Sequence, residues 1–317
     1  MSLTRRNFIK TSIAAGLTIG ATAIPNPALA GKPKKLKKAK RVIIFTFDGI
    51  RVDAFKSART PNLDELVANG SASFATRDVM PSVTLPNYTS HLLGAGPEIH
   101  GVTDNSWHVD KYGIPAVVRD DEGYFPSVFQ ALKENVPGIK TAFFYNWLPL
   151  SGPYNKKYID ELVDAKDEEY AKLCDKAMDF ICANRQAPMF VFLYNVHTDH
   201  VGHVHQWMSP EYIQSIEESD AEVGRVVAKL KAEGLYEDSH LMFISDHGGV
   251  GSGHGGITEA EMIVPWVIAG PGIKRGFEIT EPNNTVNTAS TVLRLFGAPQ
   301  PLCWTGEVPQ SIFVGKK

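Results

Sequence analysis

The sequence predicts an α/β fold in which a mostly parallel central sheet is flanked by helices on both faces. Apolar, β-rich runs alternate with helical patterns along the chain, which is the element order of parallel α/β proteins. The runs lack polar alternation, as strands buried on both faces do. Because no repeat or second domain-sized block interrupts this order, we expect a single domain over residues 41–317.

The expected strands and helices alternate along most of the chain. Strands are predicted at 41–47, 141–147, 189–196, 241–245 and 263–269. Helices are predicted at 61–69, 127–135, 167–184, 210–233 and 288–296. Several of these helices begin with a capping residue or proline and end near glycine, as at Gly70 and Gly234.

Residues 1–30 have the pattern of a twin-arginine signal peptide. Arg5 and Arg6 precede a mildly apolar run over 12–24, and an Ala-Leu-Ala sequence at 28–30 suits cleavage before Gly31. The run is short and diluted by glycine and threonine, which argues against a membrane anchor. We therefore expect a periplasmic or secreted protein with no transmembrane anchor after cleavage.

Residues 31–40 form a basic linker, with six lysines and no acid. This linker is expected to be a solvated tether, and attachment to an anionic surface is the alternative. Ten positive charges lie in the first 41 residues, so the whole-chain net charge of −3 becomes −13 over residues 42–317. That balance does not favour a nucleic-acid-binding surface.

The three cysteines do not indicate a disulfide scaffold. Cys174 and Cys182 lie on one predicted helix, about 12 Å apart along its axis. That separation is too long for a bridge. Either Cys303 pairs with one of them or all three are buried thiols.

Carboxylates follow three of the predicted strands. Asp48, Asp199 and Asp246 come after the runs at 41–47, 189–196 and 241–245. The carboxyl ends of parallel strands meet at one edge, where open α/β sheets bind ligands. Three carboxylates gathered there would repel one another unless cations neutralise them.

Histidines gather in the same segments. Seven of the ten fall within 197–205 or 240–254, and His203, His247 and His254 are the candidate ligands. Mixed Asp and His ligands suit zinc, and less often manganese or iron. The remaining histidines are expected to be supporting, surface or structural residues: His91, His100, His108, His197, His200, His205 and His240.

Thr84 precedes a helix-like segment at 87–93. A hydroxyl at a helix N-terminus faces backbone N–H donors and the positive end of the dipole, which suit an anion. Taken alone, an ordinary N-cap threonine is the simpler interpretation.

Six motifs in fixed order then decide the interpretation. They are Phe47-Asp48-Gly49, Thr84-Leu85-Pro86-Asn87-Tyr88, Pro97-Glu98-Ile99-His100-Gly101-Val102, Asp104-Asn105, Asp199 with Gly202-His203, and Ser245-Asp246-His247-Gly248. Together they resemble the alkaline phosphatase superfamily, in particular its nucleotide pyrophosphatase/phosphodiesterase branch. The resemblance runs from about residue 41 to 269.

The resemblance implies a two-metal phosphoesterase acting on small-molecule phosphate esters. One metal would be held by Asp48, Asp246, His247 and the Thr84 oxygen, and the other by Asp199, His203 and His254. Thr84 would be the nucleophile and form a phosphothreonine, and Asn105 would donate to a phosphoryl oxygen. In the branch the last metal histidine lies far downstream, whereas here His254 is seven residues after His247. The nearby glycines allow a tight reversal that would bring His254 to the site.

Substrate class is the open part of this prediction. Thr84 cannot become the formylglycine of sulfatases, which argues against a sulfatase. Residues 143–152 offer no positive side chain for the extra charge of a monoester, so a phosphodiesterase or nucleotide pyrophosphatase is expected, with a phosphomonoesterase as the alternative. A non-catalytic metal- or phosphate-binding protein would gain nothing from the hydroxyl. Trp147, Tyr154 and Tyr158 follow a strand at the expected site, where they could stack on a base or simply pack against the core.

Overall fold

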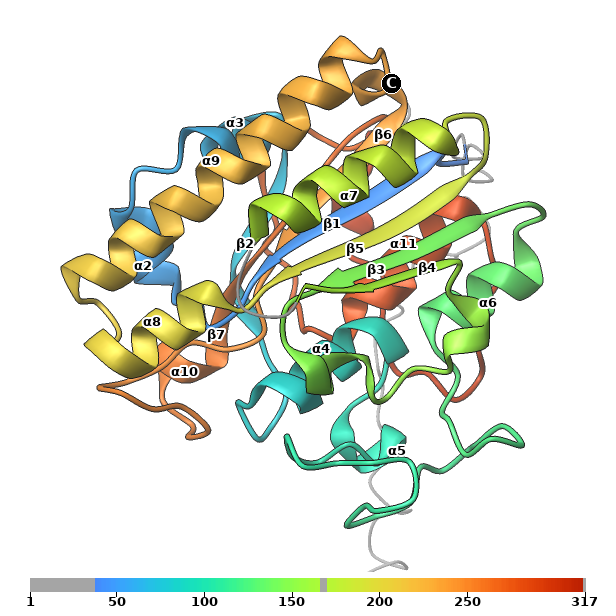
Figure 1. Ribbon diagram of the computed structural model, residues 1–317, viewed down its shortest axis with the longest axis horizontal. Coiled ribbons are helices and arrows are strands. Elements are labelled where there is room, and N and C mark those ends of the chain that lie inside the picture. The colour runs from blue at the N-terminus through green and yellow to red at the C-terminus, as the bar shows by residue number, and fades with distance from the viewer. Residues whose placement is uncertain (1–37, 166–169, 316–317) are drawn as a thin grey trace, which may run out of the picture. The chain divides into compact units, whose positions relative to one another are not determined.

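An eight-stranded sheet runs through the computed structural model, which describes residues 38–165 and 170–315 (Figure 1). The strand order is β4-β3-β5-β1-β6-β7-β2-β8. The strands are β1 Arg41–Phe47, β2 Gly70–Arg77, β3 Lys140–Tyr145, β4 Glu161–Asp164, β5 Met189–Asn195, β6 Ser239–Ile244, β7 Ile263–Ala269 and β8 Phe277–Glu278. The predicted signal and most of the basic linker lie outside the described residues.

The sheet is mostly parallel, as predicted. Neighbours from β4 through β3, β5 and β1 to β6 all pair in parallel. The exception is β7, which is antiparallel to both β6 and β2. All five predicted strands are present, and β2, β4 and β8 are additional ones.

Helices cover both faces of this single α/β domain. They are α2 Val52–Ser57, α3 Pro61–Ala68, α4 Thr84–Leu93, α5 Pro97–His100, α6 Val128–Asn135, α7 Tyr170–Ala183, α8 His197–His205, α9 Pro210–Ala232, α10 Glu259–Met262 and α11 Asn287–Phe296. The predicted helices correspond to α3, α6, α7, α9 and α11. The helix-like segment at 87–93 is part of α4, which begins three residues earlier, at Thr84.

Alternation along β1 explains why both faces are buried. Val42 and Ile44 pack into one core with α4, α6 and α11, whereas Ile43, Phe45 and Phe47 pack into a second core with α3, α7 and α9. Figure 1 shows α7 and α9 over one face and α11 behind the sheet. A strand buried on both sides carries apolar side chains at successive positions, as β1 does from Val42 to Phe45.

The three cysteines are free thiols, so Cys303 forms no bridge. Only Cys174 is fully buried, because Cys182 and Cys303 are partly exposed. Among the described residues, no helix is both long and apolar enough to cross a membrane.

Candidate active site

The predicted site residues meet at the edge of the sheet where β1, β5 and β6 end. Asp48 directly follows β1, and Asp246 lies two residues beyond β6. Asp199 lies in the first turn of α8, which begins soon after β5. His203 is one helical turn further along α8, so the two side chains lie on the same face of the helix.

The first cluster surrounds the Nε2 atom of His247. This atom lies 3.1 Å from Thr84 Oγ1 and 3.1 Å from an oxygen of Asp246. It also lies 3.4 Å from Asp48 Oδ1. The three ligand-type residues Asp48, Asp246 and His247 are fully buried, and their donor atoms are close enough to hold one metal ion.

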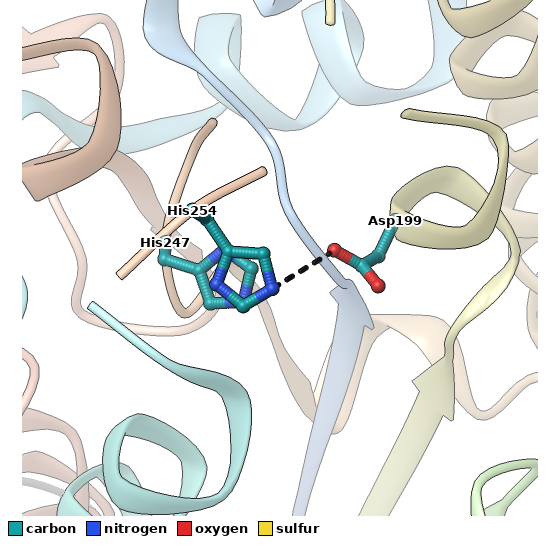
Figure 2. A group of neighbouring side chains, drawn as sticks. All are labelled: Asp199, His247 and His254. Atoms are coloured by element: carbon teal, nitrogen blue, oxygen red, sulfur yellow. Dashed lines mark ion pairs between the residues drawn. The ribbon is translucent and has the colours of Figure 1, made fainter. Parts of the chain in front are cut away.

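The second cluster surrounds Asp199. Its Oδ2 lies 3.4 Å from His203 Nε2, and its Oδ1 lies 3.8 Å from His254 Nε2. Figure 2 shows the rings of His254 and His247 stacked, with His254 facing Asp199, and the ring centroids are 3.8 Å apart. The structure therefore brings His254 to the site despite its short spacing from His247. The reversal uses Gly251 and Gly255, which have φ of +60° and +109°.

Each of the three histidines is oriented by a main-chain carbonyl. Nδ1 lies 2.9 Å from the carbonyl oxygen of Gly248 for His247, of Ser252 for His203 and of Ser82 for His254. A carbonyl oxygen only accepts, so Nδ1 must carry the proton in every case. The lone pair of each Nε2 therefore points into the site, as in metal-binding histidines.

The carboxylates present unpaired oxygens to these lone pairs. Asp48 Oδ1, Asp199 Oδ1 and Asp246 Oδ2 are buried and lack a hydrogen-bond partner in the described structure. Burial raises the pKa of all three carboxyl groups, and that of Asp48 is raised further by Asp246 and Asp199. Burial also lowers the pKa of His247 well below its usual value. Facing lone pairs without protons need a cation between them, so this donor set fits bound metal.

Thr84 is the first residue of α4, rather than a residue preceding the helix. Val83 is the N-cap and contributes no side-chain bond. Asn105 reaches the same helix end, where its Oδ1 accepts from the Leu85 N–H at 2.8 Å. Because this bond occupies the carbonyl end of the amide, the NH₂ end of Asn105 remains a donor for a ligand beside Thr84.

Trp207 is a site residue that the sequence patterns did not indicate. Its indole N–H donates to the Gly49 carbonyl at 2.8 Å, and its ring lies edge-on to His203. A Cβ added at Gly202 would lie 2.8 Å from the indole, and one at Gly249 would lie 2.4 Å from it. The glycine of the Asp199 to His203 motif is therefore required by Trp207, an aromatic four residues beyond that motif.

Of the aromatic residues considered for substrate contact, Tyr154 is not at the site. It has no exposed surface and packs against Phe129 and Phe143 in the core. The prediction that Tyr154 binds substrate is therefore not supported. Trp147 and Tyr158 are partly exposed. Trp147 lies two residues beyond the end of β3, at the carboxyl edge of the sheet.

Two of the remaining histidines have structural roles. His91 is buried, with Nε2 facing the Ser245 carbonyl at 3.1 Å and Nδ1 facing the Thr288 hydroxyl at 2.8 Å. It thus ties α4 and α11 to the residue before Asp246. His100 is also buried, and its Nε2 lies 3.0 Å from the Ser90 hydroxyl.

Comparison with known proteins identifies relatives of this chain. A family model described as type I phosphodiesterase / nucleotide pyrophosphatase matches residues 42–256. Mouse ectonucleotide pyrophosphatase/phosphodiesterase family member 3 is 25% identical over 65% of this chain and 24% of its own length. An uncharacterized pyrophosphatase/phosphodiesterase of Schizosaccharomyces pombe is 27% identical over 65% of this chain and 44% of its own length. The aligned part thus spans less than half of these relatives.

A solved structure has the same fold. Murine ectonucleotide pyrophosphatase/phosphodiesterase 5, in an inactive form in complex with AMP, superposes with a TM-score of 0.73. The match covers 88% of this chain and all of that one at 15% identity.

Proposed function

The chain belongs to the type I phosphodiesterase / nucleotide pyrophosphatase family, and from this premise we propose that it is an exported two-metal phosphodiesterase with Thr84 as nucleophile. One observation carries the proposal. Three Nε2 lone pairs and three unpaired carboxylate oxygens form two adjoining clusters, and the Nε2 of His247 lies 3.1 Å from the Thr84 hydroxyl. A fold that needed these residues only for stability would gain nothing from unpaired buried carboxylates.

Two divalent ions, zinc by the chemistry of the ligands, would be held in the two clusters. Asp48, Asp246, His247 and Thr84 Oγ1 would hold one, and Asp199, His203 and His254 the other. When bound, they supply Lewis-acid stabilisation of the attacking and leaving oxygens.

The chain's own groups carry the covalent steps. Thr84 Oγ1 loses its proton to water and forms a bond to phosphorus. The bond from phosphorus to the leaving oxygen breaks, and that oxygen takes up a proton from water. Water then cleaves the phosphothreonine and releases the phosphate monoester. The amide NH₂ of Asn105 and the main-chain N–H of Thr84 donate to the phosphoryl oxygens as negative charge develops.

The neighbourhood of Arg51 favours a diester over a monoester. Arg51 pairs with Asp53 at 2.6 Å and donates to the Gly249 carbonyl at 3.1 Å. In the described ranges, no lysine or arginine forms an ion pair with Asp48, Asp199 or Asp246. A monoester dianion needs more cationic compensation than a diester, so nucleotide-type diesters and pyrophosphates are the proposed substrates.

The test compares metal-loaded protein on a phosphodiester, a phosphomonoester and a sulfate ester of one leaving group. We expect the diester to be the best substrate, and Thr84→Ala to abolish its turnover while the metal content is retained. A strong monoester preference would overturn the substrate class, and undiminished turnover by Thr84→Ala would overturn the nucleophile.

Export is tested separately by replacing Arg5 and Arg6 with lysine. The variant should remain in the cytoplasm, whereas the unmodified chain should be recovered from the periplasm or medium. Equal export of both would remove this part of the proposal.

A further inference from the structure

The two carboxylate oxygens of Asp48 have different surroundings. Oδ1 has no hydrogen-bond partner in the described structure and lies 3.4 Å from His247 Nε2. Oδ2 accepts a hydrogen bond from the hydroxyl of Tyr194. The main chain of Asp48 is fixed as well, because its N–H donates to the Asn195 carbonyl and its carbonyl accepts from the Thr198 hydroxyl. With the main chain fixed, the two side-chain torsions of Asp48 decide where its oxygens lie, and the hydrogen bond from Tyr194 restrains both.

Tyr194 is itself held firmly. It lies in β5 beside β1 (Figure 1), in register with Thr46, and it is fully buried. Residues paired across neighbouring strands share a face, and Asp48 is two residues beyond Thr46, so Tyr194 and Asp48 lie on the same side. The ring packs edge-on against Tyr88 of α4, with centroids 5.0 Å apart.

We propose that Tyr194 is a positioning residue of the metal centre, which holds Asp48 with Oδ1 toward the ligand cluster and keeps Oδ2 out of it. A hydrogen bond from a hydroxyl to an ionised carboxylate is stronger than one between two neutral groups, and the low dielectric of a buried site strengthens it further. Asp48 then offers one oxygen in one orientation. This arrangement suits zinc, which takes few ligands, better than calcium, which takes six to eight oxygens and often binds carboxylates through both.

The inference rests on the metal centre of the proposed function, and its test requires no substrate. Tyr194→Phe removes the hydroxyl and keeps the ring. Tyr88→Phe is the matched control, because Tyr88 is also fully buried in the same core but its hydroxyl bonds to no carboxylate of the described residues. Zn²⁺ affinity is measured by competition with a chelator, and the absorption spectrum of Co²⁺-loaded protein reports the ligand arrangement.

We expect Tyr194→Phe to weaken Zn²⁺ binding by about 10–100-fold and to alter the Co²⁺ spectrum, whereas Tyr88→Phe leaves both unchanged. Melting of the two metal-free variants shows whether each is folded before titration. Unchanged affinity and spectrum in Tyr194→Phe would overturn the inference, and so would an equal loss in Tyr88→Phe. Failure of the proposed function has a different signature, namely wild-type protein that binds Zn²⁺ but hydrolyses no phosphodiester.

Discussion

At the scale of single residues, Asp78 is a buried carboxyl group outside both clusters. It directly follows β2, is 3% exposed, and neither of its oxygens has a hydrogen-bond partner in the described structure. Burial, followed by the negative charge of Asp246, raises its pKa to about 9. Asp78 is therefore protonated in the folded protein at neutral pH.

Replacing Asp78 with asparagine should raise the melting temperature at pH 8 and have little effect near pH 4. Below about pH 4 both the folded and the unfolded chain hold the proton. Between there and about pH 9 the unfolded chain releases it and the folded protein keeps it, so stability falls as pH rises. Each kcal/mol recovered should raise the melting temperature by about 2–4 °C, as calorimetry would measure.

Asp220 provides the control, because its replacement with asparagine should change the melting temperature in the opposite direction. It is also buried, but its oxygens accept from the N–H groups of Asn62 and Leu63 and from the Asn62 side chain. Asp220→Asn should therefore lower the melting temperature. A lower melting temperature for Asp78→Asn at pH 8 would contradict the account of Asp78.

At the scale of elements, the loop 248–256 and helix α8 form the second cluster by packing on Trp207. The main-chain N–H of Trp207 donates to the Gly251 carbonyl, and His203 Nδ1 donates to the Ser252 carbonyl. The loop is thus fixed to α8 through both side-chain and main-chain contacts. Its glycines differ in what surrounds them, which permits a comparison within one loop.

Gly249→Ala should weaken metal binding and lower stability, whereas Gly253→Ala should change neither. An added Cβ at Gly249 would lie 2.4 Å from the indole of Trp207, and one at Gly253 would meet nothing within 4 Å. Overpacking of this kind costs about 1–3 kcal/mol. Metal content and melting temperature of the two variants give the comparison, and equal effects would contradict the role of Trp207.

The elements also mark where sequence reasoning succeeded and where it did not. The long buried strand β1 and the helix α9 were predicted because apolar period and capping residues agree. Helix α8 was not, because six of its nine residues are polar, four of them histidine, and a glycine lies among them. The antiparallel direction of β7 was not predicted either, because an apolar run has the same pattern in a parallel and in an antiparallel strand.

At the scale of the whole molecule, strand order decides which residues meet. Asp48, Asp199 and Asp246 are far apart in sequence, yet β5, β1 and β6 are adjacent and end at one edge. The shared edge could be predicted from the sequence, because parallel strands have their carboxyl ends on one side of the sheet. The adjacency of the three strands comes from the structure. The bond from Tyr194 to Asp48 and the packing of Trp207 could not, because each depends on side-chain placement between distant segments.

Removing divalent metal should lower the melting temperature, and the loss should grow from pH 5 to pH 8. In the metal-free protein the raised pKa values of Asp48, Asp199 and Asp246 mean that the folded state keeps protons that the unfolded chain releases. Its stability therefore falls as pH rises. Bound metal takes the place of those protons, and its affinity increases with pH.

Calorimetry with and without a chelator, at several pH values, measures the gap between the melting temperatures of the metal-bound and metal-free protein. A gap that narrows as pH rises would contradict the coupling between metal binding and the three carboxyl groups. A melting temperature independent of metal would contradict the metal centre itself.

The carbonyls that orient the three histidines have a consequence for tolerance to mutation. The acceptors belong to the main chain of Ser82, Gly248 and Ser252, so no side-chain substitution can delete them. The side chain of Ser252 can therefore be exchanged without altering the hydrogen bond that aims His203. The ligand geometry therefore depends on the path of the backbone at these positions, and the site can persist when the residue at position 252 changes.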